Sequence, residues 1–183
     1  PQVRLADHPA TPVRMLDAAL VPYLLSSRYC QADRFVGFVE RAFAGLEGGL
    51  LAAALVAWVG EALHYRPGSS TGDTTALDTF ATRRGVCRDY AHLLVALARA
   101  GGIPARCVSA YAPGVDPPDF HAVAELWLGG GWRLVDATGM ASYRDLVRVC
   151  VGRDATDIAF MTLFGEGRML RQAVRVVPER APS

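Results

Sequence analysis

The sequence predicts an α+β domain, with helices in the first part of the chain and antiparallel strands in the second. Apolar residues recur at helical spacing up to residue 100, strand-like alternation follows from residue 105, and glycine- or proline-rich stretches separate the segments. With 183 residues, of which 51% are hydrophobic, the chain is long enough for one well-buried core. We expect an N-terminal arm over residues 1–30 and one core domain over residues 31–183.

The helical segments are marked by caps and by apolar faces. Prolines across residues 1–30 argue against a long helix there, so we expect an extended arm with a short helical turn lying on the core. Asp33 is expected to cap the next helix, and Thr74 or Thr75 a later short one. The expected helices cover residues 34–44, residues 50–63, a short stretch around residues 77–80, and a segment from Cys87 to Gly101.

The second part of the chain carries strand patterns. Residues 105–111 have strand character, and residues 121–128 and 132–136 flank three glycines in the pattern of a hairpin. The tail offers an arginine-bearing segment over residues 143–151, a short turn around residues 154–164, and a last strand expected at residues 169–177.

Two registers of the hairpin are possible, and they differ in where the Asp136 side chain points. Pairing Leu128 with Trp132 across a three-residue loop would turn this side chain away from the start of the first strand. Pairing Trp127 with Trp132 brings it within one diagonal step of His121 and also stacks two tryptophans across the strands. We adopt the second register.

The composition excludes several classes of function. The net charge of +1 results from 19 basic and 18 acidic residues with no run of either sign, so we expect no nucleic-acid partner and no membrane-surface binding. Every basic residue is an arginine, which excludes a lysine base or Schiff base. The longest uncharged apolar run, residues 48–60, is shorter than the roughly 20 residues of a membrane helix.

The cysteines and histidines show no metal-ligand spacing. The four cysteines form no Cys-x-x-Cys pair, so we expect no metal site and no cofactor. We expect reduced thiols and a cytoplasmic location, because no secretory leader is seen. The chain begins at Pro1 without a methionine, and we interpret it as a fragment of a longer protein.

Cys87 stands at the start of a predicted helix whose apolar stripe includes Tyr90, Leu94 and Leu97. Most cysteines are small buried core residues, so the position alone does not decide between packing and chemistry. At a helix start, however, unpaired N–H groups and the helix dipole favour the thiolate, which is the nucleophilic form. Cys87 is therefore a candidate nucleophile.

His121 and Asp136 supply the other groups that a thiol nucleophile needs. In the adopted register His121 can take the thiol proton and later give it to a leaving amine, while Asp136 holds the imidazole tautomer. A lone histidine or a strand-end aspartate is usually structural. The three residue types together predict a Cys87–His121–Asp136 triad.

The same residues resemble the transglutaminase-like superfamily, in particular its bacterial members described as cysteine proteases. The resemblance covers residues 60–140 densely, and the stretches Ser27-Arg-Tyr-Cys30 and Val151-Gly-Arg-Asp154 also look like the bacterial subfamily. The matching motifs, in order, are Gly85-Val-Cys-Arg-Asp-Tyr-Ala-His92, Gly102-Ile-Pro-Ala-Arg106, Tyr111, His121-Ala-Val-Ala-Glu-Leu-Trp127 and Trp132-Arg-Leu-Val-Asp-Ala-Thr138. Members of the subfamily usually carry a β-rich region before this core, which fits the fragment interpretation.

The resemblance implies a papain-like fold, in which the nucleophile helix packs on an antiparallel sheet that bears the histidine and the aspartate. It also implies Cys87, His121 and Asp136 as catalytic residues. The expected activity is acyl transfer through a thioester, with a peptide or protein as acyl donor. Hydrolysis of a peptide or amide is favoured. Amine crosslinking of the transglutaminase type, or a non-catalytic binding or scaffold module, stays open, and the oligomeric state is not predicted.

The remaining candidates lie around this triad. The papain-type glutamine before the cysteine is absent. By its rough position in the family, the resemblance implies Tyr65 as the candidate second donor to the oxyanion, beside the backbone N–H of Cys87; the alternative is a loop aromatic packed on the core. Asp89 is expected to buttress the structure by pairing with an arginine such as Arg106, and His92 to be a structural hydrogen-bonding residue. The other three cysteines, Cys30, Cys107 and Cys150, are interpreted as packing residues.

Overall fold

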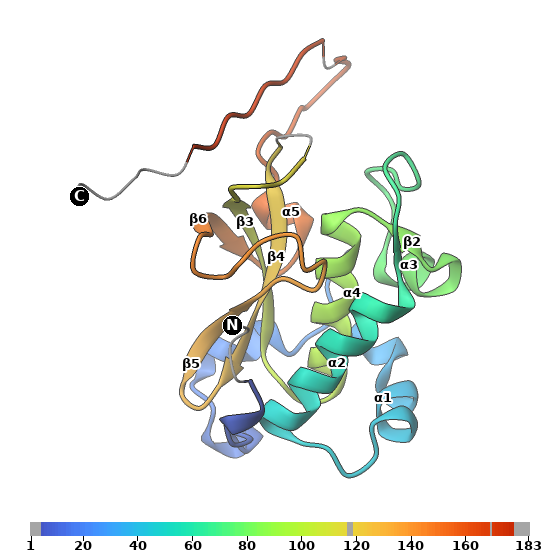
Figure 1. The fold of residues 1–183 in the computed structure, drawn as a ribbon. Coiled ribbons are helices and arrows are strands. Elements are labelled where there is room, and N and C mark those ends of the chain that lie inside the picture. Colours follow the sequence, from blue (N-terminus) through green and yellow to red (C-terminus); the bar gives the residue numbers. More distant parts are fainter. Residues whose placement is uncertain (1–4, 117–118, 169, 178–183) are drawn as a thin grey trace, which may run out of the picture.

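The computed structural model describes residues 5–116, 119–168 and 170–177, and its centre is a helix packed on a four-stranded antiparallel sheet (Figure 1). The strand order is β5-β4-β3-β6. The predicted α+β class with an antiparallel sheet is confirmed. The strands are β3 (Ala105–Tyr111), β4 (His121–Leu128), β5 (Gly131–Val135) and β6 (Val147–Gly152).

The helices follow the predicted segments with shifted ends. Thr75 caps α3 in a capping box with Asp78, as predicted. The prediction for Asp33 is wrong, because residues 32–34 form a separate 3-10 turn and the Asp33 carboxylate accepts a hydrogen bond from Ser26 at 2.5 Å. The α-helices are α1 (Val36–Ala42), α2 (Gly48–Ala62), α3 (Ala76–Thr82), α4 (Cys87–Ala100) and α5 (Ala155–Ile158). Among the described residues, none of these helices has the length and apolar character of a membrane span.

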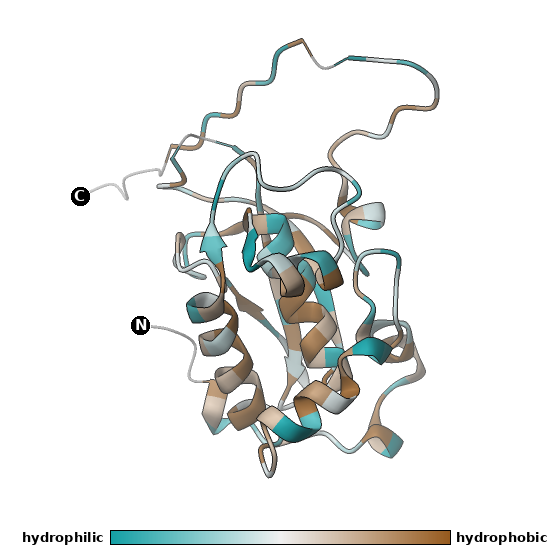
Figure 2. Cartoon of the chain, turned by 90° about the vertical axis from the view of Figure 1, so that its right-hand side faces the viewer, coloured by the Kyte–Doolittle hydropathy of each residue, from teal (hydrophilic) through white to brown (hydrophobic). Residues whose placement is uncertain are grey.

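The core lies between α4 and one face of the sheet. Leu93, Leu94 and Leu97 of α4 are fully buried against the alternate residues Ala124 and Leu126 of β4. Figure 2 shows the hydrophobic colouring concentrated on α2 and α4, where they face the interior. Because burial of each leucine stabilises the fold by about 1.5–3 kcal/mol, this contact fixes the position of the start of α4 relative to the sheet.

The segment before α1 lies on the core through short 3-10 turns. The carbonyl oxygen of Leu5 lies so close to α2 that a Cβ added at Gly49 would meet it at 1.8 Å, which explains the glycine there. Farther along, the Arg99 guanidinium donates to the Leu25 carbonyl at 3.0 Å and the Ser27 hydroxyl at 3.1 Å. The arm contains the turns Leu5–Asp7, Val13–Met15 and Ala18–Tyr23.

The hairpin adopts the predicted register. Trp127 pairs with Trp132, and their rings meet edge to face at a centroid distance of 5.4 Å. The turn itself is Gly129-Gly130, both with positive φ (57° and 77°), a conformation that glycine adopts without strain. The register therefore brings Asp136 to the end of the sheet where β4 begins.

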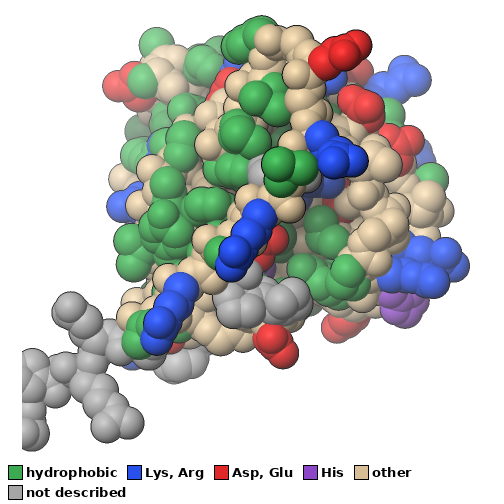
Figure 3. Space-filling model, turned by 90° about the horizontal axis from the view of Figure 1, so that it is seen from above, with side chains coloured by type: hydrophobic (Ala, Val, Ile, Leu, Met, Phe, Trp, Pro, Cys, Tyr) green, Lys and Arg blue, Asp and Glu red, His purple; other side chains and the backbone are tan. Residues whose placement is uncertain are grey.

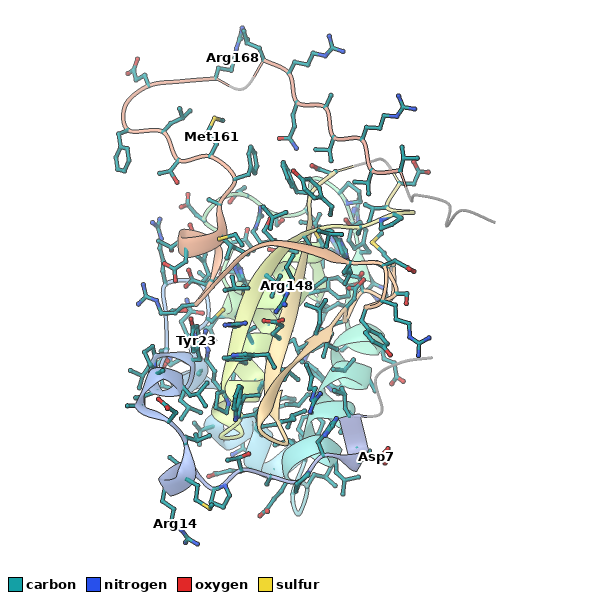
Figure 4. The ribbon with its side chains drawn as sticks, turned by 90° about the vertical axis from the view of Figure 1, so that its left-hand side faces the viewer. Asp7, Arg14, Tyr23, Arg148, Met161 and Arg168 are labelled. Carbon is teal, nitrogen blue, oxygen red and sulfur yellow. The ribbon has the colours of Figure 1, made fainter. Side chains whose placement is uncertain are left out.

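The sheet face that points away from α4 carries a buried ion network. The Glu125 side chain is 2% exposed and accepts from Arg106 at 2.6 Å and from Arg148 at 2.8 Å. The Arg106 guanidinium also lies 4.0 Å from the ring centre of Trp132. Figure 4 shows Arg148 in front of the strands and Tyr23 on the arm beside them. The predicted pairing of Asp89 with Arg106 is wrong, because Arg106 pairs with Glu125 across the strands. Asp89 instead lies 3.8 Å from the Arg88 guanidinium.

The tail differs from the prediction at both ends. The last predicted strand is wrong over residues 170–177, which have no strand partner, and Met169 lies outside the described residues. The fourth strand is instead β6, within the arginine-bearing segment, and it pairs with β3. This segment becomes a strand because it pairs with the free edge of β3, and the local sequence does not indicate that pairing.

Candidate active site

Cys87 is the first residue of α4 and is partly exposed. The Asp89 carboxylate caps this helix by accepting the backbone N–H of Val86 at 2.7 Å. A Cβ at Gly85 would meet the Asp89 Cβ at 2.5 Å, so only glycine allows this close approach. The Gly-Val-Cys-Arg-Asp motif thus shapes one tight helix start, in which the cysteine is held at the positive end of the helix dipole.

Removing the Asp89 cap is expected to loosen this helix start. Asp89→Ala is expected to lower the free energy of unfolding by about 1–2 kcal/mol, because the Val86 N–H loses its partner. Chemical denaturation measures the change. Asp73→Ala is the matched control, since Asp73 forms only an exposed pair with Arg28 at 3.5 Å. Equal effects of the two substitutions would contradict the capping role.

Tyr65 is brought to the nucleophile by a short parallel pairing. The two-residue strands β1 (His64–Tyr65) and β2 (Arg84–Gly85) pair so that Tyr65 lies opposite Gly85, two residues before the cysteine. Burial, followed by the charge of Cys87, raises the pKa of the Tyr65 hydroxyl. The hydroxyl is therefore protonated at neutral pH, close to Cys87, and able to donate a hydrogen bond.

His121 and Asp136 form a buried pair. The imidazole Nε2 lies 2.9 Å from Asp136 Oδ2, and both side chains are nearly inaccessible. Nδ1 of His121 is also buried and has no hydrogen-bond partner among the described residues. Since Nε2 is engaged by the carboxylate, Nδ1 is the ring nitrogen that stays available.

The Asp136 carboxylate is fixed by the loop that follows it. Oδ1 accepts the Thr138 N–H at 2.9 Å and the Thr138 hydroxyl at 2.7 Å, while Oδ2 accepts the Ala141 N–H at 2.9 Å. Burial by itself would raise the pKa of this carboxyl, but the hydrogen bonds from His121 and Thr138 lower it. Asp136 therefore carries a negative charge directed at the imidazole.

The charge of Asp136 determines the protonation state of His121. Burial by itself would lower the pKa of the imidazole, but its interactions with Asp136 and then with Cys87 raise the pKa to about 9. At neutral pH the imidazole is therefore an imidazolium. The three side chains therefore bring a sulfur at a helix start, an imidazolium and a carboxylate together, which are the groups that thiol-based nucleophilic catalysis uses.

The family model described as the transglutaminase-like superfamily matches residues 47–137, a range that contains all four candidate site residues. The chain belongs to the transglutaminase-like superfamily. The predicted papain-like arrangement, with a nucleophile helix on an antiparallel sheet, is the fold of this superfamily and is confirmed.

Solved structures and curated relatives agree with this assignment. A crystal structure named "Putative Cysteine Protease" from Cytophaga hutchinsonii is 39% identical, with a TM-score of 0.85, over 90% of this chain and 57% of that chain. The periplasmic domain of TgpA from Pseudomonas aeruginosa, bound to ethylmercury, is 27% identical, with a TM-score of 0.53, over 72% of this chain and 53% of that chain. An uncharacterized protein of Mycobacterium leprae is 34% identical over 123 residues, which are 63% of this chain and 44% of that protein. The chain spans about half the length of these proteins.

This transglutaminase-like domain also contains a cluster of potential metal ligands, which the spacing of cysteines and histidines in the sequence did not indicate. Cys30, His92 and Cys107 are buried, and their potential ligand atoms lie within 4.8 Å of one another. The Ala155 N–H donates to His92 Nε2 at 3.1 Å, which places the imidazole proton on Nδ1. Neither nitrogen then offers a free lone pair, so the donor set as it stands does not fit a metal ion. His92 is the structural hydrogen-bonding residue that was predicted.

Two features of the site were not predicted from the sequence. The parallel pairing of β1 with β2 joins segments of two residues each, which are too short to show a strand pattern. The Thr138 and Ala141 contacts to Asp136 depend on the conformation of the loop after β5. The signal that could have indicated this loop is the Asp-Ala-Thr-Gly stretch, since aspartate, threonine and glycine are typical of side-chain-stabilised turns.

Proposed function

We propose that this domain is a cysteine-dependent acyl-transfer enzyme that hydrolyses a peptide or amide through a thioester on Cys87. The observation that carries the proposal is the buried His121–Asp136 pair, which leaves Nδ1 of the imidazole for the thiol. The likeness to a structure named as a cysteine protease supports hydrolysis. The substrate we propose is a peptide or protein acyl donor, with neither a nucleic acid nor a membrane as partner.

The reaction follows from the protonation states of the site. The Cys87 thiolate attacks the donor carbonyl carbon, and the carbonyl electrons move to its oxygen. The His121 imidazolium then donates its proton to the leaving amine as the C–N bond breaks and the thioester forms. The neutral imidazole next takes a proton from water, whose oxygen attacks the thioester. The acid leaves, and the Cys87 thiolate is regenerated. Asp136 positions the imidazole throughout.

Two donors are available for the oxyanion of each tetrahedral intermediate. The Cys87 N–H lies in the first turn of α4, where it has no partner within the helix. The Tyr65 hydroxyl is beside Cys87 and is protonated. We propose that these two groups together stabilise the negative oxygen.

Tyr65→Phe tests the second donor. We expect kcat to fall about 10²- to 10³-fold with little change in KM, because the lost hydrogen bond is made in the transition state. Steady-state kinetics on an amide donor measure both constants. Tyr143→Phe is the matched control, since its hydroxyl contacts Arg144 instead. Unchanged kcat in Tyr65→Phe would remove this tyrosine from the oxyanion site.

The thioester itself tests the proposed function. Wild-type protein is mixed with a panel of peptide amides and quenched in acid, and intact mass is measured. We expect an acyl adduct on wild type and none on Cys87→Ala. Release of free acid in water supports hydrolysis, and transfer to an added primary amine at a higher rate would favour the crosslinking alternative. No adduct with any donor, and no turnover, would favour a binding or scaffold module on this fold.

We further propose that the enzyme acts in a reducing compartment, the cytoplasm, where a nucleophilic thiol is kept reduced. The four free cysteines support this proposal. A membrane-impermeant maleimide applied to intact cells is then expected to leave Cys87 unlabelled. Labelling in intact cells would place the site outside the inner membrane, in the compartment of the TgpA domain.

A further inference from the structure

Three aromatic rings stack beside the histidine of the site. Tyr111 ends β3 and Phe120 directly precedes His121, and the two rings lie 5.5 Å apart at an interplanar angle of 28°. Phe160, which follows α5, stacks on Phe120 at 5.3 Å and 15°. The sheet register creates the contact, because Ala110 pairs with His121 and so brings Tyr111 next to Phe120. We name these three rings the aromatic stack.

The aromatic stack is open to solvent, unlike an aromatic cluster of a core. Phe160 is 58% exposed and Tyr111 38% exposed. Exposed apolar surface of this kind gains free energy when a ligand covers it. The rings therefore remain exposed in the folded domain and can bind an apolar group.

The aromatic stack borders the proposed catalytic groups. Asp119, next to Phe120 in the chain, contributes to raising the pKa of the Tyr65 hydroxyl, although burial and Cys87 contribute more. The segment that carries Phe120 therefore lies within electrostatic reach of Tyr65. Cys87 has Tyr65 as one neighbour and His121 as the other. Phe120 of the aromatic stack directly precedes His121, and Tyr111 follows Ala110, the strand partner of His121.

The tail bounds the far side of this surface. Residues 161–168 arch away from the domain, as the labelled Met161 and Arg168 show in Figure 4. The chain then returns, and the Gln172 amide donates to the Asp119 carboxylate at 2.5 Å. Figure 3, the view from above, shows hydrophobic side chains gathered on this face and basic side chains along a segment that crosses it.

We propose that Tyr111, Phe120 and Phe160 form a subsite that binds an aromatic or large aliphatic side chain of the peptide acyl donor. The inference rests on the proposed function. A donor whose carbonyl carbon lies at the Cys87 sulfur has adjacent side chains within a few ångströms of His121, and flat rings match a flat or branched apolar group. Phe160 is the ring to test, because it is half-exposed and its removal leaves the core intact.

The test compares peptide amides that differ in one side chain, phenylalanine, leucine, alanine or aspartate. Wild type is expected to prefer phenylalanine and leucine donors over alanine. Phe160→Ala is expected to lower kcat/KM for these two donors by about 10- to 100-fold and to leave the alanine donor unchanged. Phe160→Leu, which keeps an apolar side chain, is expected to restore most of the preference. The matched control is Phe164→Ala, whose ring is 98% exposed on the same tail.

Binding separates this inference from the proposed function. Calorimetry on Cys87→Ala, with and without Phe160→Ala, measures the affinity for the phenylalanine peptide when no reaction is possible. Weaker binding in the double variant supports the subsite even if wild type turns over no donor. Equal binding by both proteins, or an unchanged donor preference in Phe160→Ala, would overturn it.

Discussion

Cys87→Ala is expected to reduce turnover of an amide donor by more than about 10⁴-fold, because no other group can form the thioester. The loss is expected in kcat, with donor binding largely retained. The fold should persist, since Cys87 is at a partly exposed helix start and its replacement removes a single atom. Kinetics and the unfolding midpoint, measured on the same preparation, check both expectations.

Cys150→Ala is the matched control for this loss. Cys150 is also partly exposed, but its thiol contacts the carbonyls of Val151 and Asp157 on β6 and α5. We expect the kcat of Cys150→Ala to stay within about a factor of two of wild type, as for most substitutions outside the active site. Substantial turnover by Cys87→Ala would show that the chemistry uses another group.

Asp136→Asn is expected to reduce kcat by about 10²- to 10⁴-fold while leaving the hairpin folded. The amide can still contact His121 and Thr138, but it carries no charge to stabilise the imidazolium. Steady-state kinetics measure the loss. An activity close to that of wild type would show that the carboxylate plays no part in positioning or charging His121.

The pH dependence of the same variant gives a second, independent readout. The pKa of His121 is raised to about 9, so wild-type activity is expected to fall as the pH rises through 9 and the imidazolium loses its proton. By linkage, the stability that the charged pair contributes is present below the ordinary histidine pKa of 6.5 and is lost as the pH rises through 9. In Asp136→Asn the alkaline limb should move to lower pH. If activity in Asp136→Asn falls at the same alkaline pH as in wild type, the fall reports the titration of a group other than His121.

Local signals in the sequence predicted the parts of the site that lie on regular elements. The apolar stripe after Cys87 predicted a helix start at the cysteine, and that start is where α4 begins. The tryptophan pairing predicted the hairpin register, and the alternation of side chains along a strand then placed Asp136 beside His121. These inferences succeeded because periodicity and pairing are properties of short segments.

The features that depend on distant segments were not predictable in this way. Arg106 pairs with Glu125 of the neighbouring strand, a partner that only the register of the sheet brings to it. Residues 170–177 contain three valines, which favour strands, but they form no strand, because local propensity is not sufficient without a partner. The convergence of Cys30 and Cys107 likewise arises from the packing of the arm on β3.

The charged pair of sulfur and imidazole is tested most directly by the rate at which iodoacetamide alkylates Cys87 at pH 6, followed by mass spectrometry. At this pH His121 is protonated, and a neighbouring thiolate should react much faster than free cysteine, which is almost entirely thiol. In His121→Ala we expect the rate to fall to that of free cysteine. Labelling of wild-type Cys87 no faster than free cysteine, and unchanged in His121→Ala, would contradict the account.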